Sequence, residues 1–546
     1  MSFTQCMKTK FYQLLLRTLQ KTFFNVISNS TKWDEKSFSL HTWKISPLPL
    51  KRNRRNDRWM SVSTGLQAVI LFVGLFLLSC EMTPSKPDEL PDISLEYSVS
   101  IPSMPIDTVH VSCTIREAAD RASITMLVPP IYADNPLLEQ ESNNFHNVLI
   151  TDSDQNILSH TTDTLIYGIF KNCYITFPVT SIPITIEYDV TFNYESHPTM
   201  PVPHIGSSDG YLQGLYVFAV PFTASDMVDI WRSQYDMLVS YSLGSGVNLY
   251  GDPVTNASFD NPYELLFSTS ALLSSSIVQN QILFEGTAQG QPFRFVNVST
   301  STTFTQSLLD SVKTNFIAIL DDILPSFGTI GTDPFTIITG INDKIGLEGM
   351  YAFCLRNPKS GSSNALNMTM AHEMSHSWVG VRVGEYDDPW WKEGTATYLG
   401  LLIPKRNGLC SKEYIQETLL DTLGYVPAVD KYALSDRAIR PIIFTSPDNV
   451  ATLVYRKGAQ VSMLLDRYIR VVSGNTTTFD KILGAFVQQF DGACFHRNEY
   501  ISFLNNHCNG DVQSIFTQYV DGTGAVPYSV LVENYNALDS LGAFGD

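Results

Sequence analysis

The chain has 546 residues, of which 44% are hydrophobic and 16% are charged. This composition is typical of a globular protein with an ample core, and the length suits two to four domains. The formal net charge of −18 is unevenly spread, because residues 1–59 carry 12 Lys+Arg against 3 Asp+Glu while the remainder carries 24 against 51. So acidic a body argues against nucleic acid as a partner.

A short apolar run near the N-terminus indicates export. Residues 66–79 are mostly apolar, follow the basic residues 51–58 and precede Cys80. The run is shorter than a membrane-spanning helix requires and is typical of a signal-peptide core. Leu77-Leu-Ser-Cys80 resembles the lipobox of bacterial lipoproteins, whose cysteine is lipidated and becomes the new N-terminus. We expect residues 1–80 to be an extension and lipoprotein signal peptide, with a plain secretory signal or an uncleaved anchor as the alternative.

The location follows from that expectation. A lipid on Cys80 would anchor the mature protein in the bacterial cell envelope, at the outer membrane or the cell surface, so the membrane is a partner only through this anchor. The Pro- and acid-rich residues 81–91 suit a tether between the lipid and the folded body.

Residues 95–221 contain short runs in which β-branched or aromatic residues alternate with polar ones. Four such runs are Thr108–Ile115, Ser123–Val128, Cys173–Phe177 and Ile184–Phe192. Alternation with period two predicts half-buried strands. We therefore expect a β-sandwich-like N-terminal domain, which together with the tether covers residues 81–285.

The next region mixes strands and helices, over residues 286–405. The predicted elements are strands at 293–298, 335–339 and 346–355, the last at the sheet edge, and helices at 304–324, 364–376 and 393–402. Pro325 is expected to end the first of these helices. This is the α+β order of thermolysin-like catalytic domains. Residues 406–546 are predicted to form an α-helical C-terminal domain, with its longest apolar-striped helix at 451–470.

His372-Glu373-x-x-His376 is the motif with the clearest chemical meaning. Residues four apart lie on one face of a helix, so the two histidines can hold one metal ion from the same side, with Glu373 as general base. Sixteen residues separate His376 from Glu393, which opens a second apolar helix and can supply the third ligand. One zinc ion per chain is the expected cofactor, and a chance motif on a surface helix is the alternative.

Six cysteines lie beyond the processed region, and none has metal-type spacing. They are Cys113, Cys173, Cys354, Cys410, Cys494 and Cys508. We expect structural roles for all six. Export permits disulfides, and Cys494 and Cys508 are close enough in sequence to pair, but the pairing stays open.

With these residues in view, the chain resembles the gluzincin metallopeptidases. His372 to Gly380, Trp390-Trp391 and Tyr455-Arg-Lys-Gly-Ala459 are similar to the aminopeptidase N family. Gly346-Leu347-Glu348 and the stretch from Tyr455 to residue 522 resemble the glycyl aminopeptidase family, which we favour because that likeness is sustained to near the C-terminus. The resemblance implies the same three-domain fold and a peptide substrate.

The resemblance also implies a role for each residue of the site. His372, His376 and Glu393 correspond to the zinc ligands, and Glu373 to the base that activates water and passes its proton to the leaving amine. Tyr455 corresponds to the donor that stabilises the oxyanion of the tetrahedral intermediate. Its alternative is a packed core tyrosine on an amphipathic helix.

Glu348 carries the expectation of an exopeptidase. In the resembling families, a glutamate at this position binds the α-ammonium of the substrate. The chain is therefore expected to be a zinc-dependent aminopeptidase that removes N-terminal residues, with small ones such as Gly or Ala preferred. Gly349 departs from the His or Asn of those families, and the alternative is that Glu348 is an ordinary edge-strand carboxylate.

Two other classes of function stay open. One is a catalytically inactive, peptide-binding surface lipoprotein that keeps the metallopeptidase fold, against which the intact Glu373 argues. The other is a structural lipoprotein with a chance motif. The natural substrate and the oligomeric state are not predicted.

Overall fold

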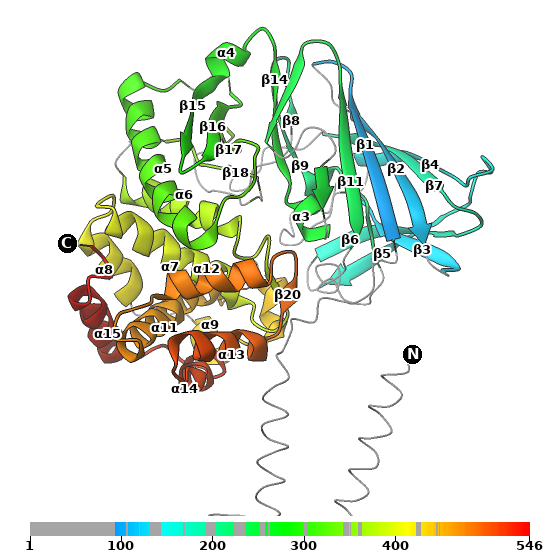
Figure 1. Cartoon of the computed structure of the whole chain (residues 1–546). Helices are drawn as coiled ribbons and strands as arrows, with labels where there is room; N and C mark the ends of the chain where they lie inside the picture. Colours follow the sequence, from blue (N-terminus) through cyan, green and yellow to red (C-terminus); the bar gives the residue numbers. More distant parts are fainter. Residues whose placement is uncertain are drawn as a thin grey trace, which may run out of the picture. The chain divides into compact units, whose positions relative to one another are not determined.

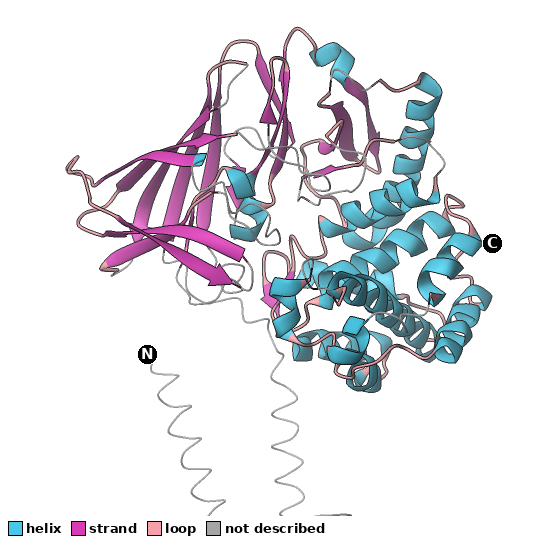
Figure 2. Cartoon of the chain, turned by 180° about the vertical axis from the view of Figure 1, so that it is seen from behind, coloured by secondary structure: helices cyan, strands magenta, loops and turns pink. Residues whose placement is uncertain are grey.

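The computed structural model describes 93–104, 108–118, 121–129, 144–167, 170–192, 204–222, 235–251, 257–259, 262–299, 303–341, 349, 351–358, 363–421, 427–443, 446 and 448–545. Cys80 and Glu348 lie outside these residues. The chain divides into two compact units, Met1–Glu81 and Met82–Asp546, and all described residues belong to the second. Within it, strands dominate the first half and helices the second, which confirms the expected fold class (Figures 1 and 2). The predicted limits at 285 and 405 stay predictions.

The N-terminal region contains two sheets that share one apolar core. The first has the order β13 (Ala257–Phe259), β11 (Asp236–Leu243), β1 (Ile93–Ile101), β2 (Thr108–Ala118), β7 (Ile184–Thr191), β4 (Phe145–Thr151). The second has the order β10 (Val220–Pro221), β3 (Ser123–Leu127), β6 (Phe170–Pro178), β5 (Thr161–Tyr167). Alternate residues of β1 and β7 are buried, and the same core contains Met126 and Phe177 of the second sheet. The two inner faces form the expected sandwich.

Two further sheets complete the strand-rich part of the described chain. One has the order β12 (Val247–Gly251), β14 (Thr269–Ser274), β9 (Asp209–Gln213), β8 (His204–Ile205). The other has the order β15 (Ile282–Ala288), β16 (Gln291–Asn297), β17 (Phe335–Thr339), β18 (Ala352–Cys354). The short helices α3 (Pro262–Leu266) and α4 (Val278–Gln281) flank β14. Tyr211, Leu273, Ile338 and Cys354 belong to one small apolar cluster, so these sheets pack against each other.

The strand predicted at 346–355 is confirmed as the edge of its sheet, but it is shorter than expected. Among the described residues of this stretch, Ala352–Cys354 pairs with β17, while residues 346–348 and 350 lie outside the described part. The helix predicted at 304–324 is longer than expected: α5 spans Gln306–Phe327, and Pro325 does not end it. A proline removes one helical hydrogen bond and frees the carbonyl four residues earlier. Here that carbonyl, of Asp321, accepts a hydrogen bond from Gln289 Nε2 at 2.8 Å, and the helix continues to Gly328, whose φ is 80°.

The helical half begins at the zinc motif. Its α-helices are α6 (Asn364–His376), α7 (Trp390–Arg406), α8 (Lys412–Leu420), α9 (Pro427–Lys431), α10 (Val450–Thr452), α11 (Gly458–Val472), α12 (Phe479–Gln489), α13 (Arg497–Cys508), α14 (Gln513–Ile515) and α15 (Tyr528–Ser540). Two π-helical turns, Leu453–Lys457 and Phe516–Val520, follow α10 and α14. The loop after α6 contains β19 (Gly384–Glu385), which pairs with β20 (Cys494–Phe495).

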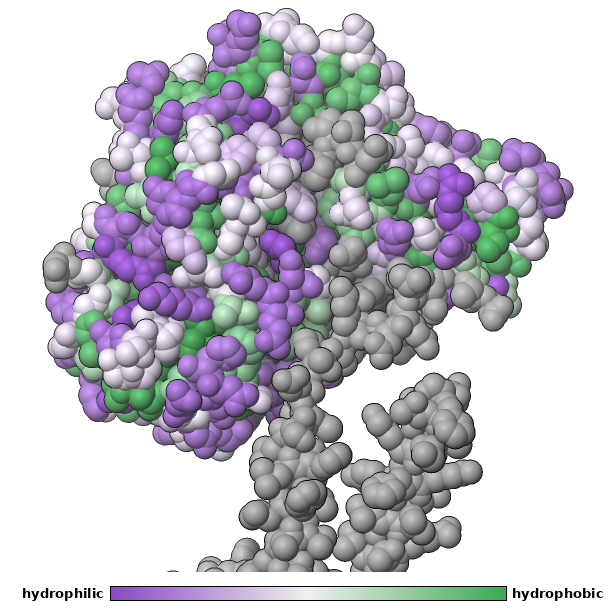
Figure 3. Space-filling model, viewed as in Figure 1, coloured by the Kyte–Doolittle hydropathy of each residue, from purple (hydrophilic) through white to green (hydrophobic). Residues whose placement is uncertain are grey.

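The large core joins α5, α6, α7 and α11, and its side chains include three fully buried tryptophans, Trp378, Trp390 and Trp391. Figure 3 shows polar and apolar residues interspersed on the face in view, as expected where the apolar side chains are collected inside. Every helix in the described part of the chain is too short or too polar to cross a bilayer. The disulfide considered for Cys494 and Cys508 is not formed.

Candidate zinc centre and active site

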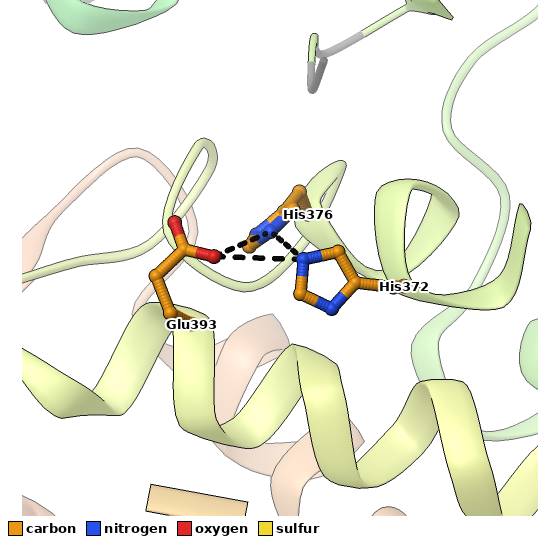
Figure 4. Close-up of side chains that lie close together, drawn as sticks. All are labelled: His372, His376 and Glu393. Atoms are coloured by element: carbon orange, nitrogen blue, oxygen red, sulfur yellow. Dashed lines mark hydrogen bonds and ion pairs between the residues drawn. The ribbon is translucent and has the colours of Figure 1, made fainter. Parts of the chain in front are cut away.

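The two histidines of the motif lie on the last turns of α6. The helix begins where the Ser363 hydroxyl accepts a hydrogen bond from the backbone N–H of Leu366, at 3.1 Å. His372 and His376 are 7% and 0% exposed, and their Nε2 atoms are 3.1 Å apart. The predicted one-face arrangement is therefore present, and both imidazoles point to one position (Figure 4).

Glu393 completes this position from the first turn of α7. Its Oε2 is 3.5 Å from His372 Nε2 and 3.3 Å from His376 Nε2. One candidate ligand atom from each of the three residues lies within 4.8 Å of the others, the one such His/Cys/Asp/Glu group among the described residues. Glu393 Oε2 is buried and has no hydrogen-bond partner there, although buried carboxylate oxygens are normally satisfied. Two imidazole nitrogens and one unsatisfied carboxylate oxygen fit zinc.

Glycines bring α6 and α7 close enough for this geometry. A Cβ on Gly400 of α7 would lie 3.1 Å from the Cβ of His372 and 3.0 Å from the carbonyl oxygen of Met368. A Cβ on Gly394 would lie 2.5 Å from the Cα of Gly458, at the start of α11. Larger residues would push the helices apart, so the small side chains set the distance between the ligands.

The second nitrogen of each histidine also has a partner. His376 Nδ1 donates to the carbonyl of Val379 at 3.1 Å, which leaves Nε2 as the lone-pair nitrogen. His372 Nδ1 is 3.4 Å from the Thr397 hydroxyl. Such partners orient metal-binding imidazoles and fix their tautomer.

The charge on Glu393 is stabilised by its surroundings. Burial alone would raise the pKa of this carboxyl, but the neighbouring groups His376, Lys392 and His372 together hold the pKa well below its usual range. Lys392 Nζ is 3.6 Å from Oε1, the oxygen that does not face the histidines. Glu393 is therefore ionised, as a metal ligand must be.

Glu373 lies next to the ligands but is not one of them. It is 7% exposed and follows His372 on α6. Burial and, less strongly, the nearby negative charge of Glu373 raise the pKa of the thiol of Cys354, the last residue of β18. The predicted base is thus largely shielded from water and adjacent in the chain to a ligand, where a carboxylate is an effective proton acceptor.

Tyr455 lies beside one of the ligands. Its ring lies 5.9 Å from the His372 ring, with 15° between the planes. It is partly buried and projects from the π-helical turn Leu453–Lys457, a kind of turn that is common at functional sites. The location beside the ligands favours the oxyanion role over the core alternative, although the role itself stays a prediction.

The tryptophans near the motif pack against aromatic rings of other elements. Trp378 lies 5.6 Å from the Phe327 ring, and Trp391 lies 4.8 Å from the Phe495 ring. These contacts join the zinc helices to α5 and to β20, which holds both helices in place.

Gly349, which replaces the usual His or Asn, has a structural reason to be glycine. A Cβ there would overlap with the carbonyl oxygen of Ala352 and would lie 3.1 Å from that of Phe267. Its own carbonyl accepts a hydrogen bond from Ser377 Oγ at 3.2 Å, just after α6. This close approach ties the segment after Glu348 to the zinc helix.

Sequence reasoning missed several residues that shape the site. Gly394, Thr397 and Gly400 follow one another at intervals of three along α7, and Lys392 precedes Glu393. The glycines within an otherwise apolar helix were the available signal, because glycine in a helix interior costs stability unless close packing requires it. The partner of His376 is a backbone carbonyl, which no side-chain pattern reveals.

Comparisons with known proteins agree with this geometry. Residues 350–519 match the profile of the Peptidase family M1 domain, a range that contains the three ligand residues, Glu373 and Tyr455. No curated protein sequence matches the chain. The profile match and the site indicate a zinc metallopeptidase domain over residues 350–519, with zinc as its cofactor.

Solved structures share the fold at low sequence identity. An aminopeptidase N family protein from Idiomarina loihiensis has a TM-score of 0.58 and 14% identity, over 80% of this chain and 78% of that one. The M1 zinc metallopeptidase from Deinococcus radiodurans has a TM-score of 0.51 and 13% identity, over 80% of this chain and 95% of that one. Yeast LTA4 hydrolase in complex with bestatin has a TM-score of 0.51 and 12% identity, over 81% of this chain and 71% of that one. These names lie on the aminopeptidase N side of the resemblance, and the preference for the glycyl family stays a prediction.

Proposed function

We propose that this metallopeptidase is an aminopeptidase that removes N-terminal residues, with Gly and Ala preferred, from peptides outside the cytoplasm. The observation that carries the proposal is the convergence of His372, His376 and the unsatisfied Oε2 of Glu393 beside the buried Glu373. The family profile over residues 350–519 and the aminopeptidase N name of one similar structure support the same reading.

The residues divide the chemistry among them. When bound, zinc supplies a Lewis acid that polarises the scissile carbonyl and the attacking water. Glu373 accepts a proton from that water and then delivers it to the amine that leaves. Tyr455 donates a hydrogen bond from its hydroxyl to the oxyanion that develops on the carbonyl. The helices α6 and α7 and the π-helical turn Leu453–Lys457 hold these groups before the substrate arrives, so little reorganisation is expected to accompany the reaction.

The exopeptidase part of the proposal rests on Glu348. A carboxylate there would bind the substrate's ammonium, and holding that charge one residue from the metal would select the first peptide bond. The adjacent Gly349 accepts a hydrogen bond from Ser377 Oγ, just after the zinc helix, and this contact supports the proposal. The preference for Gly and Ala comes from the glycyl aminopeptidase resemblance alone.

Export and lipid attachment at Cys80 are part of the proposal and rest on the sequence. Labelled palmitate is expected to enter the wild-type protein and not Cys80→Ser. Equal labelling of both proteins would remove the anchor and leave a secreted or otherwise held enzyme.

A paired experiment tests the enzymatic part. Glu373→Gln is expected to bind zinc as the wild type does and to lose at least about two orders of magnitude in rate, the scale of a positioned general base. Wild type is expected to cleave a Gly- or Ala-initiated peptide and to spare its N-acetylated form. Cleavage of both peptides at one rate would rule out an aminopeptidase, and zinc binding without turnover would favour the inactive peptide-binding alternative.

A further inference from the structure

Lys392 lies beside Glu393, a proposed zinc ligand, which is an unusual position for a positively charged side chain. It precedes Glu393 on α7, and its Nζ lies 3.6 Å from Glu393 Oε1. Its side chain is 17% exposed, so the interaction is only partly screened by water. The other oxygen, Oε2, faces the two histidines. One carboxylate therefore stands between an ammonium group and the metal position.

Two other groups hold the Lys392 side chain in this place. Its Nζ lies 5.0 Å from the centroid of the Phe267 ring, which precedes β14 and is 5% exposed. Gly380, in the loop after α6, has φ +95°, and a Cβ on it would overlap with the Lys392 stem. The left-handed Gly380, the Phe267 ring and the Glu393 carboxylate thus surround the Lys392 side chain. This side chain is therefore more restricted in conformation than a lysine on the surface.

We propose that Lys392 is a positioning residue that holds Oε1 of Glu393, confines this ligand to coordination through Oε2, and weakens zinc binding in exchange for a more electrophilic metal. The inference rests on the proposed zinc ligands. It assigns Lys392 no contact with the substrate.

The sign of the effect follows from charge. The two histidines contact oxygen atoms of Val379 and Thr397. A hydrogen-bond acceptor of this kind makes an imidazole a stronger metal ligand. Lys392 is a cation, so it draws negative charge away from the carboxylate and repels the dication across it. Ordinary structural damage at Lys392 would loosen zinc, whereas loss of this repulsion tightens it. The direction of the change therefore separates the two explanations.

Three variants isolate the charge. Lys392→Met keeps an unbranched stem of similar length and removes the ammonium. Lys392→Arg keeps the charge in a different shape. Lys412→Met is the matched control, since it removes one lysine charge from the exposed pair with Asp539, 2.5 Å apart. Each protein is stripped of metal and titrated with zinc against a chelator, to give a Kd for zinc, and its Tm is recorded.

Lys392→Met is expected to bind zinc about tenfold more tightly than wild type, the lower end of effects from outer partners of metal ligands. Its kcat is expected to fall about tenfold with KM little changed, because a metal with a stronger donor set polarises the carbonyl less. Lys392→Arg and Lys412→Met are expected to keep the wild-type Kd.

A spectrum gives a second readout that does not depend on turnover. With cobalt(II) in place of zinc, Lys392→Met is expected to show weaker visible absorption than wild type, because Oε1 is released to bind and raises the coordination number. Unchanged or weaker zinc binding by Lys392→Met at an unchanged Tm would overturn the inference, and so would an Arg variant that behaves like the Met variant. Those results leave the proposed function intact if wild type binds zinc, whereas a wild type without zinc would overturn both.

Discussion

Two buried carboxylates near the start of α7 are held in opposite ways. Asp388, just before the helix, is 2% exposed, and its two oxygens accept from Arg497 Nε at 3.0 and 2.9 Å. Glu393, in the first turn, keeps one buried oxygen without a hydrogen-bond partner among the described residues. A carboxylate that the protein satisfies fully is structural, whereas one with an unsatisfied oxygen that faces two imidazoles is available to a metal ion.

The structural carboxylate belongs to a wider network. Arg497 also pairs with Asp521 at 2.6 Å, and the neighbouring Asp387 pairs with Arg437 and with His496. Burial raises the pKa of Asp388, and the Arg497 guanidinium lowers it again in part. These pairs anchor the start of α7 to α13 from outside the zinc position. Because the Asp388–Arg497 network fixes the start of the helix, Glu393 Oε2 is not needed to hold α7 in place.

The largest expected effect comes from exchanging the acid for its amide at each place. Glu393→Gln removes the charge that zinc needs and is expected to weaken zinc binding more than about 100-fold, beyond what partners of ligands contribute. Asp388→Asn is expected to change the Kd for zinc by less than about tenfold and to lower the Tm instead. Chelator competition and thermal unfolding on both variants check this, and equal loss of zinc would contradict the distinction between the two regions.

Tyr455→Phe sharpens the comparison on the zinc side. The hydroxyl is proposed to act only in the transition state, so kcat is expected to fall about 100- to 1000-fold with KM and Tm little changed. Steady-state kinetics with a Gly- or Ala-initiated peptide, together with a melting curve, measure this. A lower Tm at an unchanged kcat would instead identify a core tyrosine.

Arg497→Met tests the structural side. It leaves Asp388 buried without its cation, and loss of one partner of a buried pair costs about 3–5 kcal/mol in the free energy of unfolding. Chemical denaturation measures the loss, and zinc affinity is expected to stay near wild type. The control is Arg116→Met, whose pair with Glu96 at 2.6 Å is exposed and is expected to contribute no more than about 1 kcal/mol. A cost for Arg497→Met as small as that of the control would contradict the structural role.

The sequence predicts the two regions unequally. The zinc ligands could be predicted because helical spacing places His372 and His376 on one face, and because few residue types bind zinc. The sandwich could be predicted from the alternation of apolar and polar residues. Asp388 and Arg497 are far apart in the sequence, so their pairing depends on how α13 packs, which no local pattern encodes.

One error in the helices has its origin in tertiary structure. Pro325 did not end α5 because a distant side chain, Gln289, satisfies the carbonyl that the proline frees. Here a tertiary contact overrides a sound local rule, which is why such a departure is seen only in the folded chain.

A third buried charge, Lys457, gives the smallest and most conditional effect. It is fully buried two residues after Tyr455, and its Nζ donates to the carbonyl of Gly522 at 2.9 Å. Burial lowers its pKa from 10.5 to about 8. Below pH 8 both the folded and the unfolded chain are protonated at this lysine, so the folded state bears the cost of a buried ammonium. Between pH 8 and 10.5 the unfolded chain binds a proton that the folded chain does not, so stability rises with pH.

Relative to Lys457→Met, wild type is therefore expected to gain up to about 3 kcal/mol in the free energy of unfolding as the pH rises from 8 to 10.5. Chemical denaturation of both proteins at several pH values measures the difference. Lys412→Met is the control, because that lysine is 49% exposed and its removal is expected to leave the dependence on pH as in wild type. A constant difference between wild type and Lys457→Met over this range would show that Lys457 is satisfied as an ammonium in the folded protein, like the carboxylate of Asp388 and unlike that of Glu393.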